Sequence, residues 1–495
     1  MIIGNRVSLS SVVYSILLFI IIIFSFRNFS YKFYPLLNAD MAINILMSPD
    51  YQLPQDLYAW GQDRGGTLIP LISHYLNILV PISPVSVVSI VHYLILIMGF
   101  LATSVMLKTR ISKVFLAILW FFPPWHFTDF VLFPFGTQFS LFMTGVWLVR
   151  QSENKAGFFQ KHLFLALSCF MMILSIWVSE LGILMVVLLI VFGIYSAIFN
   201  KSEFRSTLRL NQILHILFWV IIAIVFILYA KSTATRIDVY SDKPFNTYTE
   251  IAGSLKIIFL SLYNVFIFSS ENTIESIYAW MLLAGIMIIK GMAIFGNKEW
   301  FQKTNKKWFL FFLINGILTL IVIIISHWVF LNGVGRRYFV LVYISFALVV
   351  LFLAETFEKR KLRTLQVLSA VIILTGAISS CYKFYYPRHI PSRIKVLSEF
   401  QSLGNIGLIA EYWNSYLSAT PDPIRIKATP HDKDYVRNYK LVEEVLAQPR
   451  IYVIKDMWMD TFPDTLYQFG RILVRKGDSF YIGQCWVNQY EIVSH

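Results

Sequence analysis

The sequence predicts an α-helical polytopic membrane protein with about eleven transmembrane helices and a small C-terminal α/β domain outside the cytoplasm. Three observations support this fold class. The 495 residues are 57% apolar and only 14% charged, with a mean hydropathy of +0.64, whereas soluble domains are about 45–50% apolar and about 25% charged. Long apolar runs recur up to about residue 381, and the rest of the chain is polar. A soluble globular enzyme, a disordered chain and a collagen-like fibre are therefore excluded.

A helix needs about 20 apolar residues to cross a bilayer, and eleven stretches are candidates. No small-residue cleavage site follows the first stretch, so we expect an uncleaved helix rather than a signal peptide. The third and fourth stretches are too short to cross alone, and we expect the segment 121–124 and its flanks to extend them. The stretches are residues 7–26, 85–107, 111–122, 136–149, 162–178, 180–199, 211–230, 274–296, 308–330, 338–356 and 364–381.

The distribution of positive charge predicts the orientation of these spans. With the N-terminus in the cytoplasm, every inner loop is basic, whereas the outer turns 123–135 and 179–180 contain no Lys or Arg. This is the positive-inside pattern, and an odd number of spans places the C-terminus outside. The Lys and Arg residues cluster in the inner loops. These clusters account for the net charge of +14, so the charge does not indicate nucleic acid as a partner. They are Lys108, Arg110 and Lys113; Arg150, Lys155 and Lys161; Lys201, Arg205 and Arg209; Lys298, Lys303, Lys306 and Lys307; and Lys359, Arg360, Lys361 and Arg363.

The sequence predicts two domains. Residues 1–381 form the membrane domain, whose long outer loops 27–84 and 231–273 contain apolar stretches at 68–80 and 251–268, which we expect to be juxtamembrane helices. Residues 382–495 form an extracytoplasmic α/β domain. In this tail, helix-like stretches at 392–403 and 434–447 alternate with strand-like runs at 406–410, 424–428, 450–454 and 479–482.

The three cysteines are too few for a disulfide scaffold or a zinc site built from cysteine. Cys381 and Cys485 both lie outside the cytoplasm in this topology, where disulfides persist. The sequence leaves open whether they form a bridge or remain free thiols.

Ionisable residues that can carry chemistry gather in the predicted outer loops. Such residues are costly at membrane depth and are usually functional. The candidates are Asp40 shortly after the first span, Asp63 and Arg64 in a Gly-rich turn, His126 and Asp129 after Pro123-Pro124, Glu180 at the sixth span, His327 near the end of the ninth, and Arg336 and Arg337 at the start of the tenth.

Each candidate also has a structural alternative. Asp40 can be the N-cap of a helix that begins at Met41, and Asp63 can pair locally with Arg64. His126 and Asp129 can be interfacial polar groups beneath a Pro-rich turn. Glu180 can be a helix-start charge favoured by the helix dipole, and the pair 336–337 can bind lipid headgroups. The convergence of these residues on one side of the membrane favours a functional site.

The first outer loop resembles that of the GT-C glycosyltransferases. An acid in Leu37-Asn38-Ala39-Asp40-Met41-Ala42 follows the first helix, and an aromatic and Gly-rich stretch then leads into an interfacial helix. That superfamily includes protein O-mannosyltransferases, the lipid A aminoarabinose transferase and serotype-converting glucosyltransferases. The resemblance covers the membrane part and implies that Asp40 is the catalytic base. Relatives often have two adjacent acids there, whereas Ala39 and Met41 flank Asp40, so the resemblance assigns neither a second acid nor a divalent metal.

The chemistry of sugar transfer from a polyprenyl-phosphate donor suits these residues. A base must take the proton of the acceptor hydroxyl, and cations must hold the phosphate as its negative charge grows. Asp40 can be the base, while Arg64, Arg336 and Arg337 can bind phosphate through their planar fork of donors. Adjacent helical residues point about 100° apart, so one of the neighbours faces the phosphate, and Arg337 is slightly favoured. Candidates for acceptor positioning, a second acid or a divalent metal are Asp63, His126, Asp129, Glu180 and His327.

The sequence therefore predicts an inverting glycosyltransferase in the cytoplasmic membrane. It would move a hexosyl or pentosyl group from a polyprenyl-phosphate-linked donor to a cell-surface glycan, such as O-antigen or lipopolysaccharide, on the outer face. A lipid-linked glycan transporter or flippase is an alternative, although charges at the membrane midplane and internal repeats would be expected there. A glycan polymerase or ligase is another. The sugar, acceptor, linkage, metal dependence and oligomeric state do not follow from the sequence.

Overall fold

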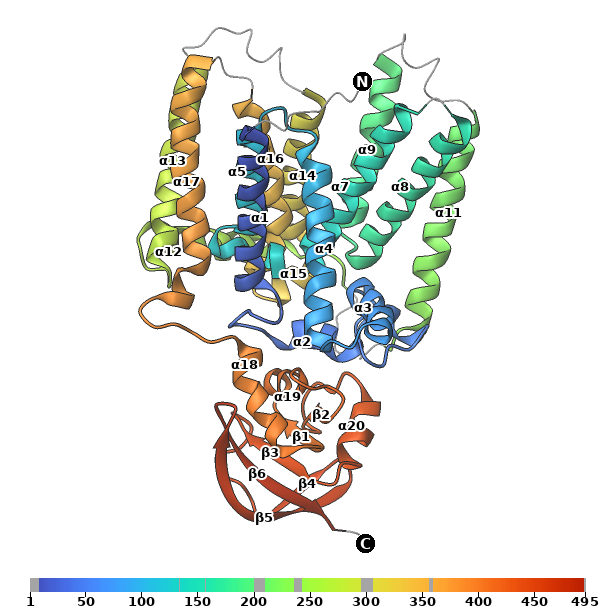
Figure 1. Cartoon of the computed structure of the whole chain (residues 1–495), viewed down its shortest axis with the longest axis vertical. Helices are drawn as coiled ribbons and strands as arrows, with labels where there is room; N and C mark the ends of the chain where they lie inside the picture. The colour runs from blue at the N-terminus through green and yellow to red at the C-terminus, as the bar shows by residue number, and fades with distance from the viewer. Residues whose placement is uncertain are drawn as a thin grey trace. The chain divides into compact units, whose positions relative to one another are not determined.

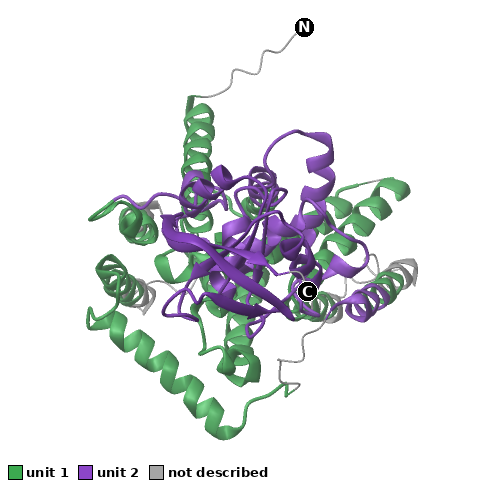
Figure 2. Cartoon of the chain, turned by 90° about the horizontal axis from the view of Figure 1, so that it is seen from below, with its two compact units in different colours: residues 1–26, 95–224, 240–388 green, residues 27–94, 225–239, 389–495 purple. Residues whose placement is uncertain are grey.

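The computed structural model describes residues 9–132, 134–155, 157–199, 210–235, 243–294, 306–355 and 359–493. Up to Tyr385 the regular structure of the described residues is mainly helical, and the tail contains a six-stranded sheet (Figure 1). It packs as two compact units, shown in different colours in Figure 2. Unit 1 comprises residues 1–26, 95–224 and 240–388, and unit 2 comprises residues 27–94, 225–239 and 389–495. Unit 2 thus combines the tail with the first outer loop, whereas the sequence predicts a boundary at residue 381.

The membrane part of the described chain is a set of long apolar helices. Each of the eleven predicted stretches contains a helix, and the long helices of unit 1 run in roughly the same direction (Figure 1). The chain is a multi-pass membrane protein. These helices are α1 (Leu9–Phe29), α4 (Pro84–Ser104), α5 (Arg110–Phe121), α7 (Pro134–Glu153), α8 (Phe158–Val178), α9 (Gly182–Phe199), α11 (Leu210–Thr233), α13 (Thr273–Ile294), α14 (Lys306–Ile325), α16 (Val340–Ala354) and α17 (Lys359–Tyr385).

The structure does not confirm the number of eleven spans. Within the described ranges, seven helices are long and apolar enough to cross a membrane, and a bent pair makes an eighth. The segment after the third stretch extends it, but as a bent pair rather than as a straight helix. Helix α5 ends at Phe121, and the short helices η2 (Trp125–Phe127) and α6 (Asp129–Leu132) continue at 72° to it. Pro123 and Pro124 cause the break, because proline lacks an N–H and disfavours a helical residue before it.

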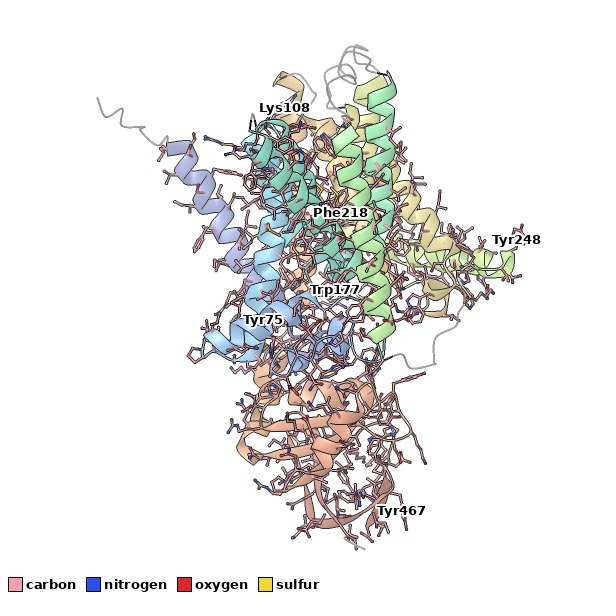
Figure 3. All side chains as sticks on the ribbon, turned by 90° about the vertical axis from the view of Figure 1, so that its right-hand side faces the viewer. Tyr75, Lys108, Trp177, Phe218, Tyr248 and Tyr467 are labelled. Carbon is pink, nitrogen blue, oxygen red and sulfur yellow. The ribbon has the colours of Figure 1, made fainter. Side chains whose placement is uncertain are left out.

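One end of unit 1 gathers three segments that the charge pattern places on the same side. Arg110 at the start of α5 donates hydrogen bonds to Ser10 and Ser11 at the start of α1. The backbone N–H of Lys108 donates to Glu355 at the end of α16, over 2.8 Å. Figure 3 shows Lys108 at this end and Trp177 towards the other. Which end faces the cytoplasm stays a prediction, and the basic clusters at 201–209 and 298–305 lie outside the described residues.

The other end of unit 1 is built by short helices and by α12 (Tyr248–Phe266), which lies across the direction of the long helices (Figure 3). Helix α12 begins with a capping box formed by Thr247 and Glu250. It covers the stretch predicted as a juxtamembrane helix, and it is also long and apolar enough to span. A buried cluster that includes Ile323 and Tyr338 fixes the adjoining short helices α15 (His327–Leu331) and η4 (Arg336–Phe339).

Unit 2 contains the first outer loop and the tail. The loop forms α2 (Ala39–Met47), η1 (Gln55–Leu57) and α3 (Leu68–Leu79), and α3 confirms the helix predicted at 68–80. The tail has the helical segments α18 (Arg393–Leu397), η5 (Ser398–Leu403), α19 (Tyr412–Ala419) and α20 (Tyr439–Leu446). Its strands are β1 (Ile406–Ala410), β2 (Ile426–Pro430), β3 (Ile451–Lys455), β4 (Thr465–Gln468), β5 (Arg471–Ile482) and β6 (Cys485–Ile492).

The sheet has the strand order β2-β1-β3-β6-β5-β4. Strands β1, β2 and β3 are parallel, and the remaining pairs are antiparallel. The four predicted strand runs coincide wholly or in part with β1, β2, β3 and β5, whereas α19, β4 and β6 were not predicted. The carboxyl ends of the three parallel strands meet at one edge, which is where open α/β sheets bind their ligands.

All three cysteines are free thiols. No bridge therefore joins Cys381 on α17 to Cys485 on β6. The tail core contains Ile409 of β1, Val453 of β3 and Tyr490 of β6, each almost completely buried.

Candidate functional site

Asp40 lies in the first turn of α2 but does not cap this helix. The side chain of Asn38 is the cap, because its Oδ1 accepts a hydrogen bond from the backbone N–H of Met41 at 3.0 Å. The capping alternative for Asp40 is therefore wrong. Its side chain is 29% exposed.

Two residues of the tail contact this carboxylate. Tyr412, at the start of α19, donates its hydroxyl hydrogen to Oδ1 of Asp40 at 3.2 Å. The guanidinium of Arg437 lies 3.9 Å from the same oxygen and 5.2 Å from the centre of the Tyr412 ring. Burial and the neighbouring Asp40 raise the pKa of Tyr412 above its ordinary value. The phenol therefore keeps its proton and remains a donor to Asp40.

The position of these contacts follows from the fold of unit 2. Helix α19 packs against α2 and against β1 and β2. The backbone N–H of Tyr412 donates to Asp434 at 2.6 Å, which fixes the start of α19 at the carboxyl edge of the parallel strands. Arg437 also donates to the carbonyl of Trp60 at 3.4 Å, so it contacts two parts of the first loop.

A cavity of about 430 Å³ borders Arg437 within unit 2. Its walls carry charges of both signs. Lys440 donates to Asp50 at 2.6 Å, and this contact lowers the pKa of Asp50 below its ordinary range. Trp60 donates its indole N–H to Asp56 at 3.0 Å. The cavity lining therefore contains both hydrogen-bond donors and acceptors.

Asp63 and Arg64 are half-buried in the turn between η1 and α3. Gly61 and Gly65 flank them with φ of 70° and 71°, a backbone region that favours glycine. The Gly-rich stretch is thus a tight turn of unit 2, and the phosphate role of Arg64 stays a prediction.

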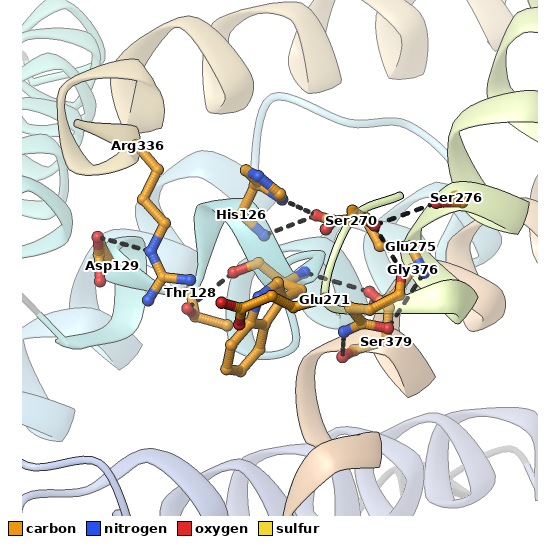
Figure 4. A network of polar contacts seen from close by, with 12 residues as sticks. His126, Thr128, Asp129, Ser270, Glu271, Glu275, Ser276, Arg336, Gly376 and Ser379 are labelled. Atoms are coloured by element: carbon orange, nitrogen blue, oxygen red, sulfur yellow. Dashed lines mark hydrogen bonds and ion pairs between the residues drawn. The ribbon is translucent and has the colours of Figure 1, made fainter. Parts of the chain in front are cut away.

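In unit 1, the indole of Trp125 lies against two cations. The guanidinium of Arg336 is 5.0 Å from the ring centre, and the ammonium of Lys383 is 5.3 Å from it. Arg336 lies 3.6 Å from Asp129, and Lys383 lies 2.9 Å from Glu271. Figure 4 shows Arg336 extending towards Asp129. The cluster therefore brings two positive charges to one aromatic ring, each compensated by a carboxylate.

His126 faces a carboxylate that the sequence analysis missed. Its backbone N–H donates to Oε1 of Glu275 at 3.0 Å, and its ring Nδ1 contacts the same oxygen (Figure 4). The side chain of Glu275 is only 5% exposed. Its second oxygen has no hydrogen-bond partner in the described part of the chain. Such a buried acceptor is costly to fold and is typical of functional sites.

Helix α17 packs against this cluster through Ser379 and Gly376. Ser379 accepts a hydrogen bond from the backbone N–H of Trp125 at 3.1 Å, and its carbonyl accepts one from Asn272 at 2.8 Å. A Cβ at Gly376 would lie 2.9 Å from the ring of Tyr278 and 3.1 Å from Pro124. Glycine there permits the close approach of α17 to the Pro-rich turn.

The remaining candidates of unit 1 lie apart from one another. His327 is nearly buried, with Nδ1 3.4 Å from Glu250 of α12. Glu180 is exposed in the connection between α8 and α9. Arg337 donates to the hydroxyl of its neighbour Tyr338 at 3.3 Å. Arg336 and Arg337 thus have different contacts, as expected of adjacent residues, and the contacts favour Arg336 as the one that faces the cluster.

The structure thus joins His126, Asp129 and Arg336 in unit 1, and it gives Asp40 partners from the tail in unit 2. Sequence reasoning missed the functional candidates Glu275, Lys383, Tyr412 and Arg437. Glu275 could have been found from the sequence, because it is an acid at the second residue of the span predicted at 274–296. Among the described residues, no group of three or more His, Cys, Asp or Glu side chains forms a metal site.

Replacement of Glu275 by Ala should lower the stability of unit 1. The backbone N–H of His126 would lose its acceptor, at a cost of about 1–3 kcal/mol, and thermal unfolding in detergent should show a lower Tm. Glu271→Ala is the matched control, because Glu271 is 88% exposed and a solvated ion pair contributes little. Equal Tm values for the two variants would show that Glu275 is not a structural acceptor.

The comparisons with known proteins give structural similarity only. No protein family and no curated protein matches the sequence. Among solved structures, the chain is similar to the oligosaccharyltransferase AglB of Archaeoglobus fulgidus in complex with an inhibitory peptide and a dolichol-phosphate. The TM-score is 0.43 and the identity 9%, over 90% of this chain and 70% of that chain. For the complex of that enzyme with Zn and sulfate, the values are 0.42 and 11%, over 88% and 68%.

The apo form of the same enzyme gives a TM-score of 0.43 and 10% identity, over 90% of this chain and 70% of that chain. The identities and TM-scores are low, so the functional argument depends on the residues of this chain.

Proposed function

We propose that the protein is an inverting membrane glycosyltransferase that uses a polyprenyl-phosphate-linked sugar donor. The observation that supports this proposal is the set of contacts made by the Asp40 carboxylate. Asn38 performs the capping that would otherwise explain the acid. Tyr412 and Arg437 both contact Oδ1, so they orient the carboxylate. A carboxylate held in this way, in the first loop behind helix α1, is arranged as a general base.

The proposed reaction is a single displacement at the anomeric carbon. Asp40 takes the proton of an acceptor hydroxyl, and the acceptor oxygen forms the new C–O bond. The bond between the anomeric carbon and the phosphate oxygen breaks, and its electron pair leaves with the polyprenyl phosphate. Because attack and departure occur on opposite faces, the configuration at that carbon inverts.

The leaving phosphate needs a cation, and we assign this role to Arg336. It lies at the edge of an apolar region, where contact with a developing anion is strong. Lys383 brings a second positive charge to the same ring of Trp125. The candidates for acceptor positioning or a second acid are still Asp63, His126, Asp129, Glu180 and His327. Arg64 and Arg337 are the alternative phosphate ligands.

The predicted topology supports the proposed membrane orientation and the proposed acceptor. The positive-inside pattern predicts a cytoplasmic N-terminus and a tail outside the cytoplasmic membrane. A polyprenyl-phosphate sugar exposed on the outer face would then meet a cell-surface glycan, such as O-antigen or lipopolysaccharide. A divalent metal is not assigned.

A transfer assay tests the proposed function. The purified chain in nanodiscs should transfer radiolabelled sugar from a polyprenyl-phosphate donor to a glycan acceptor, and nucleotide sugars should not replace the donor. Protein without donor and heat-denatured protein are the controls. If lipid-linked sugar crosses the bilayer of proteoliposomes without transfer, the protein is a transporter. If chain length grows from a lipid-linked oligosaccharide, it is a polymerase or ligase.

A further inference from the structure

A second cavity lies within the tail itself, at the carboxyl edge of the parallel strands. Its volume is about 410 Å³, within the range of about 300–1,000 Å³ that is common for ligand pockets. Its walls come from the residues after β2, the segment between β3 and β4, and β4 itself. It does not include any residue that the proposed reaction uses.

The floor of this cavity is a fixed aromatic surface. The rings of His431 and Trp458 are stacked, with centres 4.4 Å apart and planes at 10°. The indole N–H of Trp458 donates to the carbonyl of Ile454 at 3.2 Å. The ring nitrogen Nδ1 of His431 accepts a hydrogen bond from the backbone N–H of Lys433 at 3.3 Å. Both rings are therefore held in place without a ligand.

The rest of the lining combines apolar side chains, Met459, Pro463 and Leu466, with polar ones, and it is almost uncharged. Thr461, Thr465 and Gln468 contribute hydroxyl and amide groups, and Tyr467 is a rim residue that is 69% exposed (Figure 3). Burial lowers the pKa of His431 below its ordinary value, so its ring is neutral at pH 7. Lys433 is then the one charged side chain among the lining residues. A phosphate or nucleotide ligand would call for more positive charge.

This combination of groups matches the chemistry of a sugar. A pyranose ring has an apolar face of C–H groups and a rim of hydroxyls that both donate and accept. The C–H face can cover an aromatic ring, while hydroxyl and amide side chains pair with the rim. A lipid chain would leave these polar groups unpaired, at a cost in free energy.

Contacts within unit 2 connect this cavity to Asp40. Nε2 of His431 lies 3.9 Å from Asp434, and Asp434 accepts the backbone N–H of Tyr412 at 2.6 Å. The hydroxyl of Tyr412 donates to Asp40.

We propose that the cavity of His431, Trp458 and Tyr467 is a carbohydrate subsite that holds a sugar ring of the acceptor glycan. The presence of a carbohydrate site depends only on the cavity. Its assignment to the acceptor rests on the proposed function. The subsite would hold part of a long glycan while another part reacts.

Binding of oligosaccharides to the full chain in nanodiscs tests the subsite without any turnover. The probes are maltohexaose, chitohexaose and a linear mannohexaose, measured by saturation-transfer difference NMR and titration. At least one should bind, with the strongest transfer at ring C–H protons. Trp458→Ala should weaken its binding by about 10-fold or more, the scale for removal of a central tryptophan. Tyr467→Ala should weaken it less, and this exposed residue can be changed without loss of folding.

Trp486→Ala is the matched control, because Trp486 is a half-exposed tryptophan on β6 of the same domain and lies outside the cavity. It should leave binding unchanged. The proposal is overturned if none of the three probes binds, if binding survives both Trp458→Ala and Tyr467→Ala, or if Trp486→Ala removes it equally. Binding without transferase activity would retain the subsite and reject the proposed function, so the two failures are distinguishable.

Discussion

Asp40→Asn should reduce sugar transfer by about 10²–10⁴-fold, which is the usual contribution of a general base. Asparagine has the same size and can still accept the hydroxyl hydrogen of Tyr412, so the contact at 3.2 Å is retained. What it loses is the ability to take a proton from the acceptor hydroxyl. Initial rates at saturating donor and acceptor measure the effect, because a missing base lowers kcat.

Asn38→Ala is the control that separates catalysis from folding. It removes the true cap of α2 and should lower the free energy of unfolding by about 0.5–2 kcal/mol, visible as a lower Tm. Turnover of the folded protein should change little. Asp40→Asn should show the reverse pattern, with normal Tm and lost turnover. Normal turnover in Asp40→Asn would remove Asp40 as the base and make Asp63 the next candidate.

Arg336→Ala should reduce turnover by about 10²–10³-fold, the scale for loss of one donor to a developing anion. The donor phosphate gains about one negative charge as the sugar departs, and Arg336 is the arginine whose contacts point into the cluster of Trp125 and Asp129. Arg336→Lys should restore only part of the rate, because lysine supplies charge without the bidentate fork. Rates with a polyprenyl-phosphate donor at saturating concentration give the comparison.

Arg337→Ala is the neighbouring control. Arg337 contacts Tyr338 of its own helix η4, and its removal should cost little activity. Thermal unfolding must accompany both variants, because Asp129 is 7% exposed and loses a cation 3.6 Å away when Arg336 is removed. If Ala at Arg64, Arg336 and Arg337 each leaves transfer intact, none of these arginines binds the donor phosphate, and the proposed mechanism fails.

The sequence predicted the helices and the change from apolar to polar composition near residue 381 well, because both depend on consecutive residues. Apolar length is a property of consecutive residues, because a helix in lipid satisfies all its backbone hydrogen bonds within one segment. A helix therefore occurs in each of the eleven apolar stretches, and α3 occurs at residues 68–80. The strand β1 at 406–410 was predicted to the residue, since a short run of apolar residues bounded by turns is also a local signal.

Local predictions were less accurate where two local signals competed. The expected extension of the stretch before Pro123 exists, but the two prolines end α5 at Phe121 and turn the chain by 72°. Asp40 was a plausible cap by spacing, yet Asn38 also has a capping side chain and lies at the residue that precedes the helix. Strands β4 and β6 were missed because their burial depends on partners elsewhere in the sheet.

The tertiary structure determined which residues of the candidate site contact one another. The sequence by itself determined that acids, histidines and arginines follow the ends of the spans. It could not determine that Tyr412 and Arg437 contact Asp40 from 372 or more residues away, or that Glu275 contacts His126 across 149 residues. Contacts between distant segments depend on how the helices and the sheet pack, and packing is not encoded in the residues next to each site. Apolar length set the membrane fold locally, whereas the partners of each charged side chain were set by which elements pack together.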